Sequence, residues 1–240
     1  MTTLFISDLH LDAGLPGLTR LFVKFMREQA PTAEALYILG DLFEAWVGDD
    51  DHRPGTQVFI DELRHFSDRG IPLFVMHGNR DFLLASQFVE RTGCTLLPDP
   101  SLIDLYGTPT LLMHGDSLCT DDVKHQESRA MLRSDEWQQR FVSQSLEDRI
   151  RQAQEYRSMS RSHLKDSPDA IMDVNLDAVV EVMQHNNVQQ MIHGHTHRPA
   201  IHSLQVNNQA GRRIVLGDWN SHGSVLICDK NDCWLTSFTL

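Results

Sequence analysis

The sequence predicts an α/β protein with two β-sheets and an inserted helical segment, and three observations carry this prediction. Apolar runs of strand length alternate with segments of helical period in the first half of the chain. Residues 121–170 break this alternation and have the pattern of helices alone. Beyond residue 170 short strands dominate, which favours a second sheet next to a first one that is covered by helices.

The first half alternates strands with helices, which is typical of a largely parallel or mixed sheet. Gly107 lies where a tight turn is needed between two consecutive strands, so these two are expected to form a hairpin. The expected elements are strands at 4–6, 35–39, 71–76, 102–105 and 110–113 and helices at 18–26, 58–66 and 82–89.

The last third begins with one helix and continues as strands. These elements are expected as a helix at 174–183 and strands at 190–192, 200–204, 214–216, 224–227 and 234–238. The sequence therefore divides into a core of residues 1–120 and 171–240 and a helical cap of residues 121–170. The cap has nine basic and ten acidic residues. Between 149 and 165 its charges are almost all basic, which indicates either a basic face or a solvated helix of mixed charge.

The composition excludes several classes of protein. With 21 basic and 33 acidic residues the net charge is −12, which argues against a general nucleic-acid binder. No apolar run approaches the roughly 18 residues of a membrane span. Met1-Thr-Thr leads directly into a strand, which leaves no room for a signal peptide and favours a reducing cytoplasm. The four cysteines have no CxxC spacing, so neither a zinc ribbon nor a disulfide framework is expected.

Five short polar motifs each follow an expected strand. Loops at the carboxyl ends of strands converge in α/β sheets, and glycine lets such loops approach one another closely. Each motif alone is a weak signal, because a Gly-Asp after a strand is usually only a turn. Their joint occurrence in this order indicates a metal site. The motifs are Asp8-Leu9-His10, Gly40-Asp41, Gly78-Asn79-Arg80-Asp81, His114-Gly115-Asp116 and Gly194-His195-Thr196-His197.

These motifs contain seven candidate metal ligands. They are Asp8, His10, Asp41, Asn79, His114, His195 and His197. One zinc ion takes three or four protein ligands, so seven side chains fit two ions that share one carboxylate. The mixture of imidazole, carboxylate and amide suits Mn²⁺, Fe²⁺ or Zn²⁺. Two such ions roughly 3.5–4 Å apart can activate water and clamp an in-line displacement at phosphorus.

The order of these motifs resembles the calcineurin-like metallophosphoesterase superfamily, whose fold is a sandwich of two mixed β-sheets flanked by helices. Longer blocks resemble one family within it, the UDP-2,3-diacylglucosamine diphosphatases, from Thr3 to about Pro199. The blocks are ISDLHL (6–11), YILGDLFEAWVGDDD (37–51), MHGNRDFLL (76–84), LLPDP (96–100), LLMHGDSLCTDD (111–122), AIMDVN (170–175) and IHGHTHRPA (192–200).

This resemblance implies a function. The expected reaction is hydrolysis of UDP-2,3-diacylglucosamine to UMP and 2,3-diacylglucosamine 1-phosphate (lipid X) in lipid A biosynthesis. A hydroxide activated by two metals would attack the uridylyl phosphorus. The resemblance further implies two Mn²⁺ ions per chain and a peripheral position on the cytoplasmic face of the bacterial inner membrane. Neither a nucleic acid nor an obligatory protein partner is expected.

The resemblance also assigns roles to individual residues. One ion would be held by Asp8, His10, Asp41 and His197, and the other by Asp41, Asn79, His114 and His195, with Asp41 bridging. Catalysis would involve Asn79, Arg80 and His195. Substrate contacts would be made by Asn79, Arg80, Asp122, Ser160 and His195, with Lys165 and Ser167 as further candidates. The chain departs from the family pattern at Leu164 and Ser167, and Lys165 is expected to substitute for the missing lysine.

Arg80 stands where many members of the superfamily have a histidine that is a candidate general acid. A guanidinium cannot deliver a proton at neutral pH, but it binds phosphate oxygens bidentately. This suits a pyrophosphate substrate, because its leaving group is itself a phosphate. The alternative is that Arg80 only pairs with Asp81 or another acid.

The cap contains apolar side chains at helical spacing, which either bind acyl chains or simply pack a core. They are Trp137, Phe141, Leu146, Ile150, Tyr156 and Met159, with Trp46 facing them from the core. Basic residues beside an exposed apolar groove would also favour an anionic membrane surface.

Two other functions are compatible with the same motifs. One is another dinuclear metallophosphoesterase, such as a dinucleoside polyphosphate or cyclic nucleotide hydrolase. The other is a non-catalytic binding module with a vestigial metal site, which is disfavoured because none of the seven expected ligands is missing.

Overall fold

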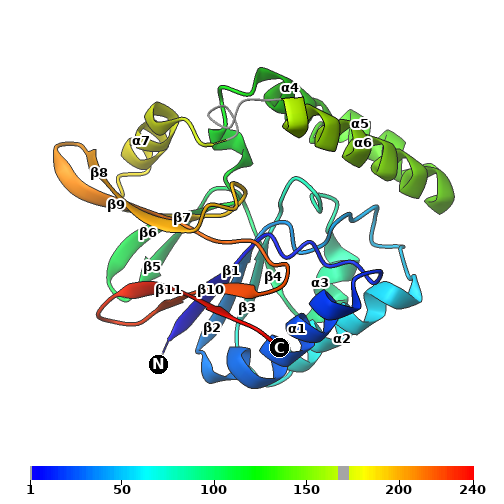
Figure 1. Cartoon of the computed structure of the whole chain (residues 1–240), viewed down its shortest axis with the longest axis horizontal. Coiled ribbons are helices and arrows are strands. Elements are labelled where there is room, and N and C mark those ends of the chain that lie inside the picture. Colours follow the sequence, from blue (N-terminus) through cyan, green and yellow to red (C-terminus); the bar gives the residue numbers. More distant parts are fainter. Residues whose placement is uncertain (1, 167–172) are drawn as a thin grey trace.

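The fold places two β-sheets face to face and covers each outer face with helices (Figure 1). It is seen in a computed structural model that describes residues 2–166 and 173–240, except for the side chains of Pro54 and 161–166. The expectation of an α/β sandwich of two mixed sheets is confirmed.

The first sheet has six strands in the order β11-β10-β1-β2-β3-β4. Strands β1 to β4 are parallel, β10 is antiparallel to β1, and β11 is antiparallel to β10. Its strands are β1 (Thr3–Ile6), β2 (Ala35–Leu39), β3 (Leu73–Met76), β4 (Thr95–Leu97), β10 (Gly223–Cys228) and β11 (Cys233–Phe238). All four residues of β1 are buried, as expected for a central strand that is covered on both faces.

The second sheet has five strands in the order β5-β6-β7-β9-β8, with parallel pairing of β6, β7 and β9 and antiparallel strands at both edges. Its strands are β5 (Ser101–Leu105), β6 (Thr108–Met113), β7 (Gln190–His193), β8 (Ala200–Val206) and β9 (Gln209–Val215). The predicted hairpin at Gly107 is the β5–β6 turn, and this glycine has a φ of +87°.

Three layers of apolar side chains hold the sandwich together. The helices α1 (Pro16–Lys24), α2 (Pro54–Ser67) and α3 (Ser86–Thr92) pack on the outer face of the first sheet. The chain continues from α1 through a π-helical turn, Phe25–Gln29, and a short 3₁₀ turn, Ala30–Thr32. Phe5 and Ile192 belong to the layer between the sheets. Helix α7 (Leu176–His185) covers the outer face of the second sheet.

Three helices form the cap above the carboxyl ends of the strands (Figure 1). They are α4 (Val123–Leu132), α5 (Asp135–Val142) and α6 (Leu146–Asp166), and the short 3₁₀ turn Asp116–Leu118 leads into them. The helical content expected for this segment is confirmed over residues 123–166. None of the helices in the described ranges is both long and apolar enough to cross a membrane.

Several expected elements differ from those observed. Strands β10 and β11 join the first sheet instead of the second, because β10 pairs with β1. The helix expected at 82–89 begins only at Ser86, since Phe82 to Ala85 continue the loop after β3. Strand β4 was not expected, because it is only three residues long.

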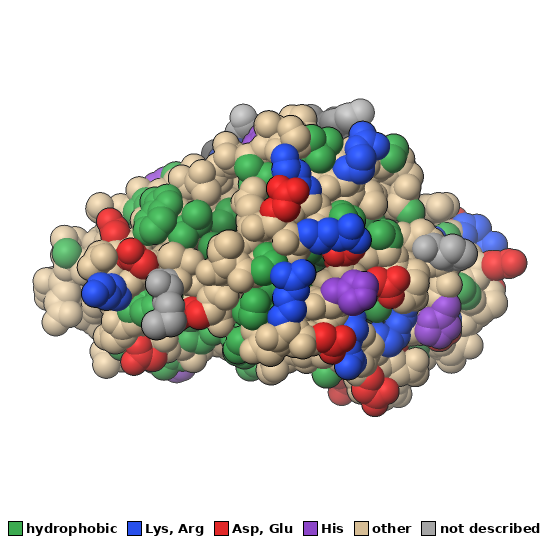
Figure 2. Space-filling view, turned by 90° about the horizontal axis from the view of Figure 1, so that it is seen from below, with side chains coloured by type: hydrophobic (Ala, Val, Ile, Leu, Met, Phe, Trp, Pro, Cys, Tyr) green, Lys and Arg blue, Asp and Glu red, His purple; other side chains and the backbone are tan. Residues whose placement is uncertain are grey.

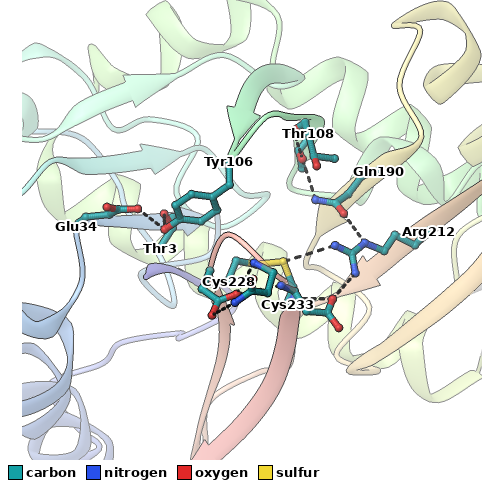
Figure 3. Close-up of a disulfide and its surroundings, with 12 residues drawn as sticks. Thr3, Glu34, Tyr106, Thr108, Gln190, Arg212, Cys228 and Cys233 are labelled. Atoms are coloured by element: carbon teal, nitrogen blue, oxygen red, sulfur yellow. Dashed lines mark hydrogen bonds and ion pairs between the residues drawn. A yellow bond between two sulfur atoms is a disulfide. The ribbon is translucent and has the colours of Figure 1, made fainter. Parts of the chain in front are cut away.

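The cysteine spacing does not indicate a disulfide, yet one pair of cysteines is joined by one. Cys228 and Cys233 lie directly opposite each other in the β10–β11 hairpin and are joined by a disulfide (Figure 3). The hairpin register brings these side chains together, and the register could not be read from a spacing of five residues. Cys94 and Cys119 are free and buried.

The underside of the core, opposite the cap, has acidic and basic side chains interspersed (Figure 2). This face is therefore not the continuous basic surface that nucleic-acid binding requires.

Candidate metal centre and active site

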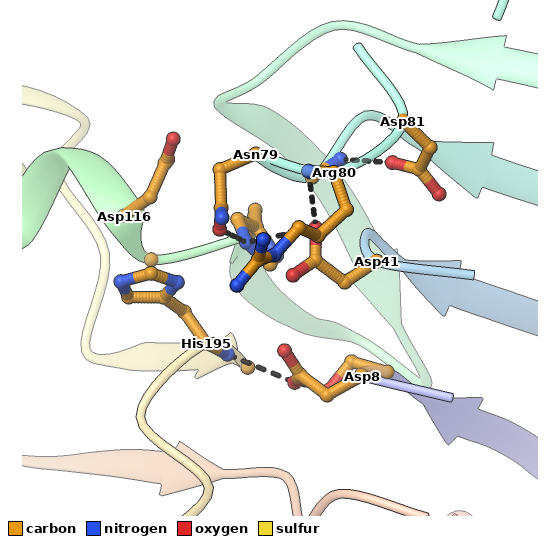
Figure 4. A network of polar contacts seen from close by, with 12 residues as sticks. Asp8, Asp41, Asn79, Arg80, Asp81, Asp116 and His195 are labelled. Carbon is orange, nitrogen blue, oxygen red and sulfur yellow. Dashed lines mark hydrogen bonds and ion pairs between the residues drawn. The ribbon is translucent and has the colours of Figure 1, made fainter. Parts of the chain in front are cut away.

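Loops that follow five strands converge at one edge of the two sheets. The loop after β1 contains Asp8 and His10, and hydrogen bonds join it to the loop after β2: Asp8 N donates to Gly40 O (3.1 Å) and His10 N to Asp41 O (3.0 Å). Across the sandwich, His195 N in the loop after β7 donates to Asp8 Oδ2 (2.9 Å). These contacts fix the loops relative to one another, and Figure 4 shows the bond from His195 to Asp8.

Five of the candidate ligands have a left-handed backbone conformation. The angle φ is 55° at Asp8, 49° at His10, 51° at Asp41, 69° at His195 and 56° at His197. This conformation costs roughly 1–2 kcal/mol for a residue with a Cβ and persists only where the surroundings enforce it. Such strain is typical of functional sites, where it re-aims a side chain.

Glycines allow the loops after β2 and β3 to touch. A Cβ on Gly78 would lie 2.1 Å from Asp41 Oδ1 and 2.2 Å from Asp41 N. At Gly40, which has a φ of +90°, a Cβ would lie 2.7 Å from Gly78 Cα. Glycine at both positions is therefore a steric requirement for the approach of Asp41 to the third loop.

Asp8, His10 and His197 form a first ligand cluster, whose ligand atoms all lie within 4.8 Å of one another. His197 Nε2 is 3.3 Å from Asp8 Oδ1 and 3.3 Å from His10 Nε2. Three atoms with lone pairs or exchangeable protons thus converge on one small volume.

Asp8, Asp41 and His114 form a second cluster by the same criterion. Asp41 faces both clusters, since its Oδ2 is 3.8 Å from His10 Nε2 and its Oδ1 is 3.8 Å from His114 Nε2. Asn79 Oδ1 adds a further oxygen 3.0 Å from His114 Nε2. Asp8 and Asp41 are thus both placed to be shared by two ions, and the assignment of Asp41 as the bridge stays a prediction.

The seventh candidate, His195, lies on the His114 side. Its ring is 5.1 Å from that of His114, measured between centroids. The structure thus brings all seven candidate ligands to one edge of the sandwich.

The donor set fits divalent cations. Asp8 Oδ1 is fully buried and has no hydrogen-bond partner among the described residues, which is costly unless a cation fills the gap. His114 Nδ1 lies 2.9 Å from Leu39 O, so this nitrogen carries the proton and Nε2 is left for a metal. Oxygen and imidazole donors without a thiolate suit Mn²⁺, Fe²⁺ or Zn²⁺.

The electrostatics of the cluster lead to the same conclusion. Burial lowers the pKa of His114, but the carboxylates of Asp41 and Asp116 outweigh it and raise this pKa to about 9. Burial raises the pKa of Asp8, yet the neighbouring imidazoles, with His197 first among them at 3.3 Å, hold it well below its ordinary value. The buried carboxylates thus concentrate negative charge in the cluster. Neutral histidines cannot balance this charge, and bound cations would do so.

Asp81 organises the loop that contains Asn79 and Arg80. Its Oδ1 accepts from Gly78 N (2.8 Å) and its Oδ2 from Leu42 N (2.7 Å). Burial and the nearby Asp41 carboxylate raise its pKa to about 6. Asp81 is therefore occupied by backbone donors and does not pair with Arg80.

The Arg80 side chain extends away from Asp81 (Figure 4), and its buried Nε has no hydrogen-bond partner in the described part of the chain. The alternative in which Arg80 pairs with Asp81 is thus wrong, while its pairing with another acid stays open, since the charge of Arg80 is among those that lower the pKa of Glu44. Its backbone N–H has a separate role, because it donates to Asp41 Oδ1 (2.8 Å).

A largely apolar cavity of about 560 Å³ opens between the metal loops and the cap. Asn79 and Arg80 form one part of its wall and Ser160 of α6 another. Its apolar lining includes Trp46, Phe82, Leu83, Leu132, Trp137, Phe141, Tyr156 and Met159. Trp137 and Phe141 are buried and stack with centroids 4.6 Å apart, so they both pack the cap and wall the cavity.

Not every expected wall or contact residue lines this cavity. Leu146 and Ile150 pack against the core instead. Asp122 is the N-cap of α4, where its Oδ1 accepts from His125 N (3.0 Å). Ser167 and the side chain of Lys165 lie outside the described residues, so their roles stay predictions.

The basic face expected on the cap is wrong in part. Arg149 is buried, donates to Val47 O (2.6 Å) and forms an ion pair with Asp50, which ties α6 to the core. Arg151 pairs with Asp148 on the surface of α6, and Arg157 pairs with Glu44. These arginines are therefore used within the chain.

Several residues of the site were missed by sequence reasoning. Glu44 lies three residues after Asp41, with its Oε2 3.1 Å from His10 Nδ1. His125 lines the cavity with its ring 5.4 Å from that of His195. Arg133 donates to Gly78 O (3.0 Å) and lies 3.4 Å from the buried Asp116. Glu44 and Asp116 lie within the sequence blocks 37–51 and 111–122 that resemble the family. Only the fold shows which neighbours they face.

The chain is similar to several known proteins. Residues 1–199 match the family model of calcineurin-like phosphoesterases. Proteins named UDP-2,3-diacylglucosamine hydrolase are 52% identical over 236 residues in Stenotrophomonas maltophilia (95% of each chain) and 49% identical over 231 residues in Marinobacter nauticus (96% of this chain, 95% of the relative). A solved archaeal phosphodiesterase covers 99% of the chain with a TM-score of 0.49 and 12% identity. The chain belongs to the calcineurin-like phosphoesterase family and, within it, to the group of UDP-2,3-diacylglucosamine hydrolases.

Proposed function

We propose that this chain hydrolyses the pyrophosphate bond of UDP-2,3-diacylglucosamine to UMP and 2,3-diacylglucosamine 1-phosphate, a step of lipid A biosynthesis. The observation that carries the proposal is the junction of two unlike environments. Two ligand clusters suited to divalent cations adjoin an apolar cavity of about 560 Å³, and Asn79 and Arg80 line the cavity at this junction. A nucleotide-linked glycolipid has the same two halves, a pyrophosphate and two acyl chains. The names of the curated relatives support this substrate.

The residues of the site divide the chemistry between them. Two Mn²⁺ ions, held by Asp8, His10, Asp41 and His197 and by Asp41, Asn79, His114 and His195, would supply an activated water and neutralise phosphate oxygens. Arg80 is fixed at its backbone by Asp41 and offers its guanidinium to the pyrophosphate. Asn79 and His195 orient the phosphate that is attacked. The leaving sugar phosphate departs as an anion, so no general acid is required. We place the attack on the uridylyl phosphorus.

The cap of residues 121–170 would act as a lid on the acyl chains. Trp137, Phe141 and Met159 provide apolar surface to the cavity, and Ser160 provides a hydroxyl at its wall. Asp122, Lys165 and Ser167 are proposed as further substrate contacts at the ends of this segment. In this arrangement the core performs hydrolysis and the cap selects a lipid substrate.

The cap also supports a location at a membrane surface. Val123, Met131 and Met159 are 62%, 47% and 68% exposed although they are apolar. We propose that the cap approaches the cytoplasmic face of the bacterial inner membrane, from which the substrate would enter the cavity.

A phosphorus-resolved assay tests the function. The purified chain is mixed with UDP-2,3-diacylglucosamine in ¹⁸O-water, with and without Mn²⁺, and ³¹P NMR identifies the products. We expect Mn²⁺-dependent formation of UMP that carries the label, together with unlabelled sugar phosphate. Label in the sugar phosphate would overturn the direction of attack. A panel that includes dinucleoside polyphosphates and cyclic nucleotides is the control, and faster turnover of either class would assign the chain to a different hydrolase.

A further inference from the structure

Glu44 lies between a candidate metal ligand and the cap. Its Oε2 is 3.1 Å from His10 Nδ1, an ion-pair distance without the alignment of a hydrogen bond. Its Oε1 forms an ion pair with Arg157 Nη2 of α6. The side chain is only 16% exposed, so water screens these contacts weakly. One carboxylate thus contacts a residue of the metal site and a residue of the cap.

Glu44 lies beside the ring nitrogen of His10 that points away from the ligand cluster. With Nδ1 next to the carboxylate, the opposite nitrogen faces inward, where His10 Nε2 is 3.8 Å from Asp41 Oδ2. His114 in the other cluster has the neutral carbonyl of Leu39 at its Nδ1. A carboxylate behind a metal-binding imidazole raises its basicity and fixes its orientation. The two clusters therefore differ in the group next to Nδ1, which is a carboxylate at His10 and a neutral carbonyl at His114.

The Glu44–Arg157 pair also separates two cavities. Both residues line the cavity of about 560 Å³ and a second one of about 340 Å³ that extends towards Arg53 and Thr56. The pair is thus part of the contact between α6 and the core, and a displacement of α6 would remove Arg157 from Glu44. Arg149 and Asp50 form a separate attachment of the same helix.

We propose that Glu44 is a positioning residue that couples the seating of the cap to the metal centre. It orients His10 for the ion that is shared with Asp8 and His197, and Arg157 holds the carboxylate in place when α6 is seated. The inference rests on the proposed two-metal function. The affinity of the ion at Asp8, His10 and His197 depends on a contact made by the cap, whereas the affinity of the other ion does not.

Metal titration in two backgrounds tests the first half of the proposal. His114→Gln leaves the cluster of Asp8, His10 and His197 intact, and His197→Gln leaves that of Asp41, Asn79, His114 and His195. Binding of Mn²⁺ is measured by calorimetry and by electron paramagnetic resonance, without substrate. We expect Glu44→Gln to weaken Mn²⁺ binding about 10- to 100-fold in the His114→Gln background, the range seen for residues behind a metal ligand. In the His197→Gln background it should change binding less than about threefold.

A double-mutant cycle tests the second half. Arg157→Gln alone should weaken Mn²⁺ binding in the His114→Gln background about fivefold, at the low end of coupling between sites. Added to Glu44→Gln, it should cause no further loss, because the carboxylate through which it acts is gone. Two matched controls should leave binding unchanged: Glu62→Gln removes a core carboxylate that is paired with Arg27, and Arg151→Gln removes a different basic residue of α6.

Each outcome decides between the hypotheses. Equal losses in both backgrounds, or none in either, would overturn the role of Glu44 while leaving the proposed function intact. Losses from Glu44→Gln and Arg157→Gln that add fully would overturn the coupling to the cap. If the unmodified chain binds no Mn²⁺ at all, the proposed function fails, and the inference fails with it.

Discussion

Replacement of Arg80 by alanine separates the role of its side chain from that of its backbone. The backbone N–H of residue 80 donates to Asp41 Oδ1 at 2.8 Å, and this bond does not need a side chain. The guanidinium lines the cavity and its buried Nε is unpartnered within the described chain, so it is available to a phosphate. Arg80→Ala should therefore keep its metals and lose transition-state stabilisation. Loss of one preorganised charge-stabilising donor costs about 2–4 kcal/mol, which corresponds to a kcat/KM that is lower by roughly 30- to 900-fold.

The assay is steady-state hydrolysis of the diacyl substrate at saturating Mn²⁺, together with metal analysis of each variant. Arg80→Lys should recover only part of the loss, because a point charge cannot replace a bidentate fork. Arg91→Ala is the matched control, since Arg91 bonds to Gln57 and does not line the cavity. An Arg80→Ala enzyme within threefold of the unmodified chain, or one that has lost its metals, would refute the reasoning.

Three further predictions follow from the site and the cap. Asp41→Ala should abolish turnover and bind at most one ion, because Asp41 faces both ligand clusters; metal analysis that finds two ions in an active variant would contradict this. Phe141→Ala should weaken the diacyl substrate much more than a water-soluble nucleotide analogue, and should also lower stability by about 3–5 kcal/mol because the ring is 3% exposed; equal kinetic losses on both substrates would assign Phe141 to packing alone. The ion pair with Arg149 lowers the pKa of Asp50 below its ordinary 3.8, so its stabilisation is present above that pH and is lost as the pH falls through the folded-state value; the difference in melting temperature between the unmodified chain and Asp50→Asn should therefore shrink as the pH falls below 3.8, and a difference that stays constant throughout acid titration would contradict the assignment.

The fold class and the convergence of the candidate ligands at one edge could both be predicted from the sequence. The candidate ligands follow short apolar strands, and the carboxyl ends of neighbouring strands meet at one edge by geometry alone. Asp8, Asp41 and His114 are brought together in this way from positions far apart in the chain. The left-handed backbone of Asp8 and His10 could not be predicted, because non-glycine residues rarely adopt it without tertiary constraint.

The errors have a common physical origin in long-range pairing. Strand β10 has the same local pattern whichever sheet it joins, and only its register with β1 decides the matter. The Cys228–Cys233 disulfide depends on the register of the β10–β11 hairpin in the same way. Arg149 was expected on an exposed face because charge runs are usually solvated, whereas Asp50 provides a partner from about a hundred residues away.

The core and the cap differ in how they contact the loops that contain the candidate ligands. The sandwich places the ligand loops through backbone hydrogen bonds, such as Asp8 N to Gly40 O, that hardly depend on which substrate is bound. The cap contacts these loops through side chains, and two of its arginines, Arg133 and Arg157, contact Gly78 O and Glu44 next to the candidate ligands. A change in the described part of the cap can therefore reach the metal centre through contacts such as these. Under the proposed function, this arrangement would allow substrate selectivity to vary in the cap while the metal chemistry of the core is retained.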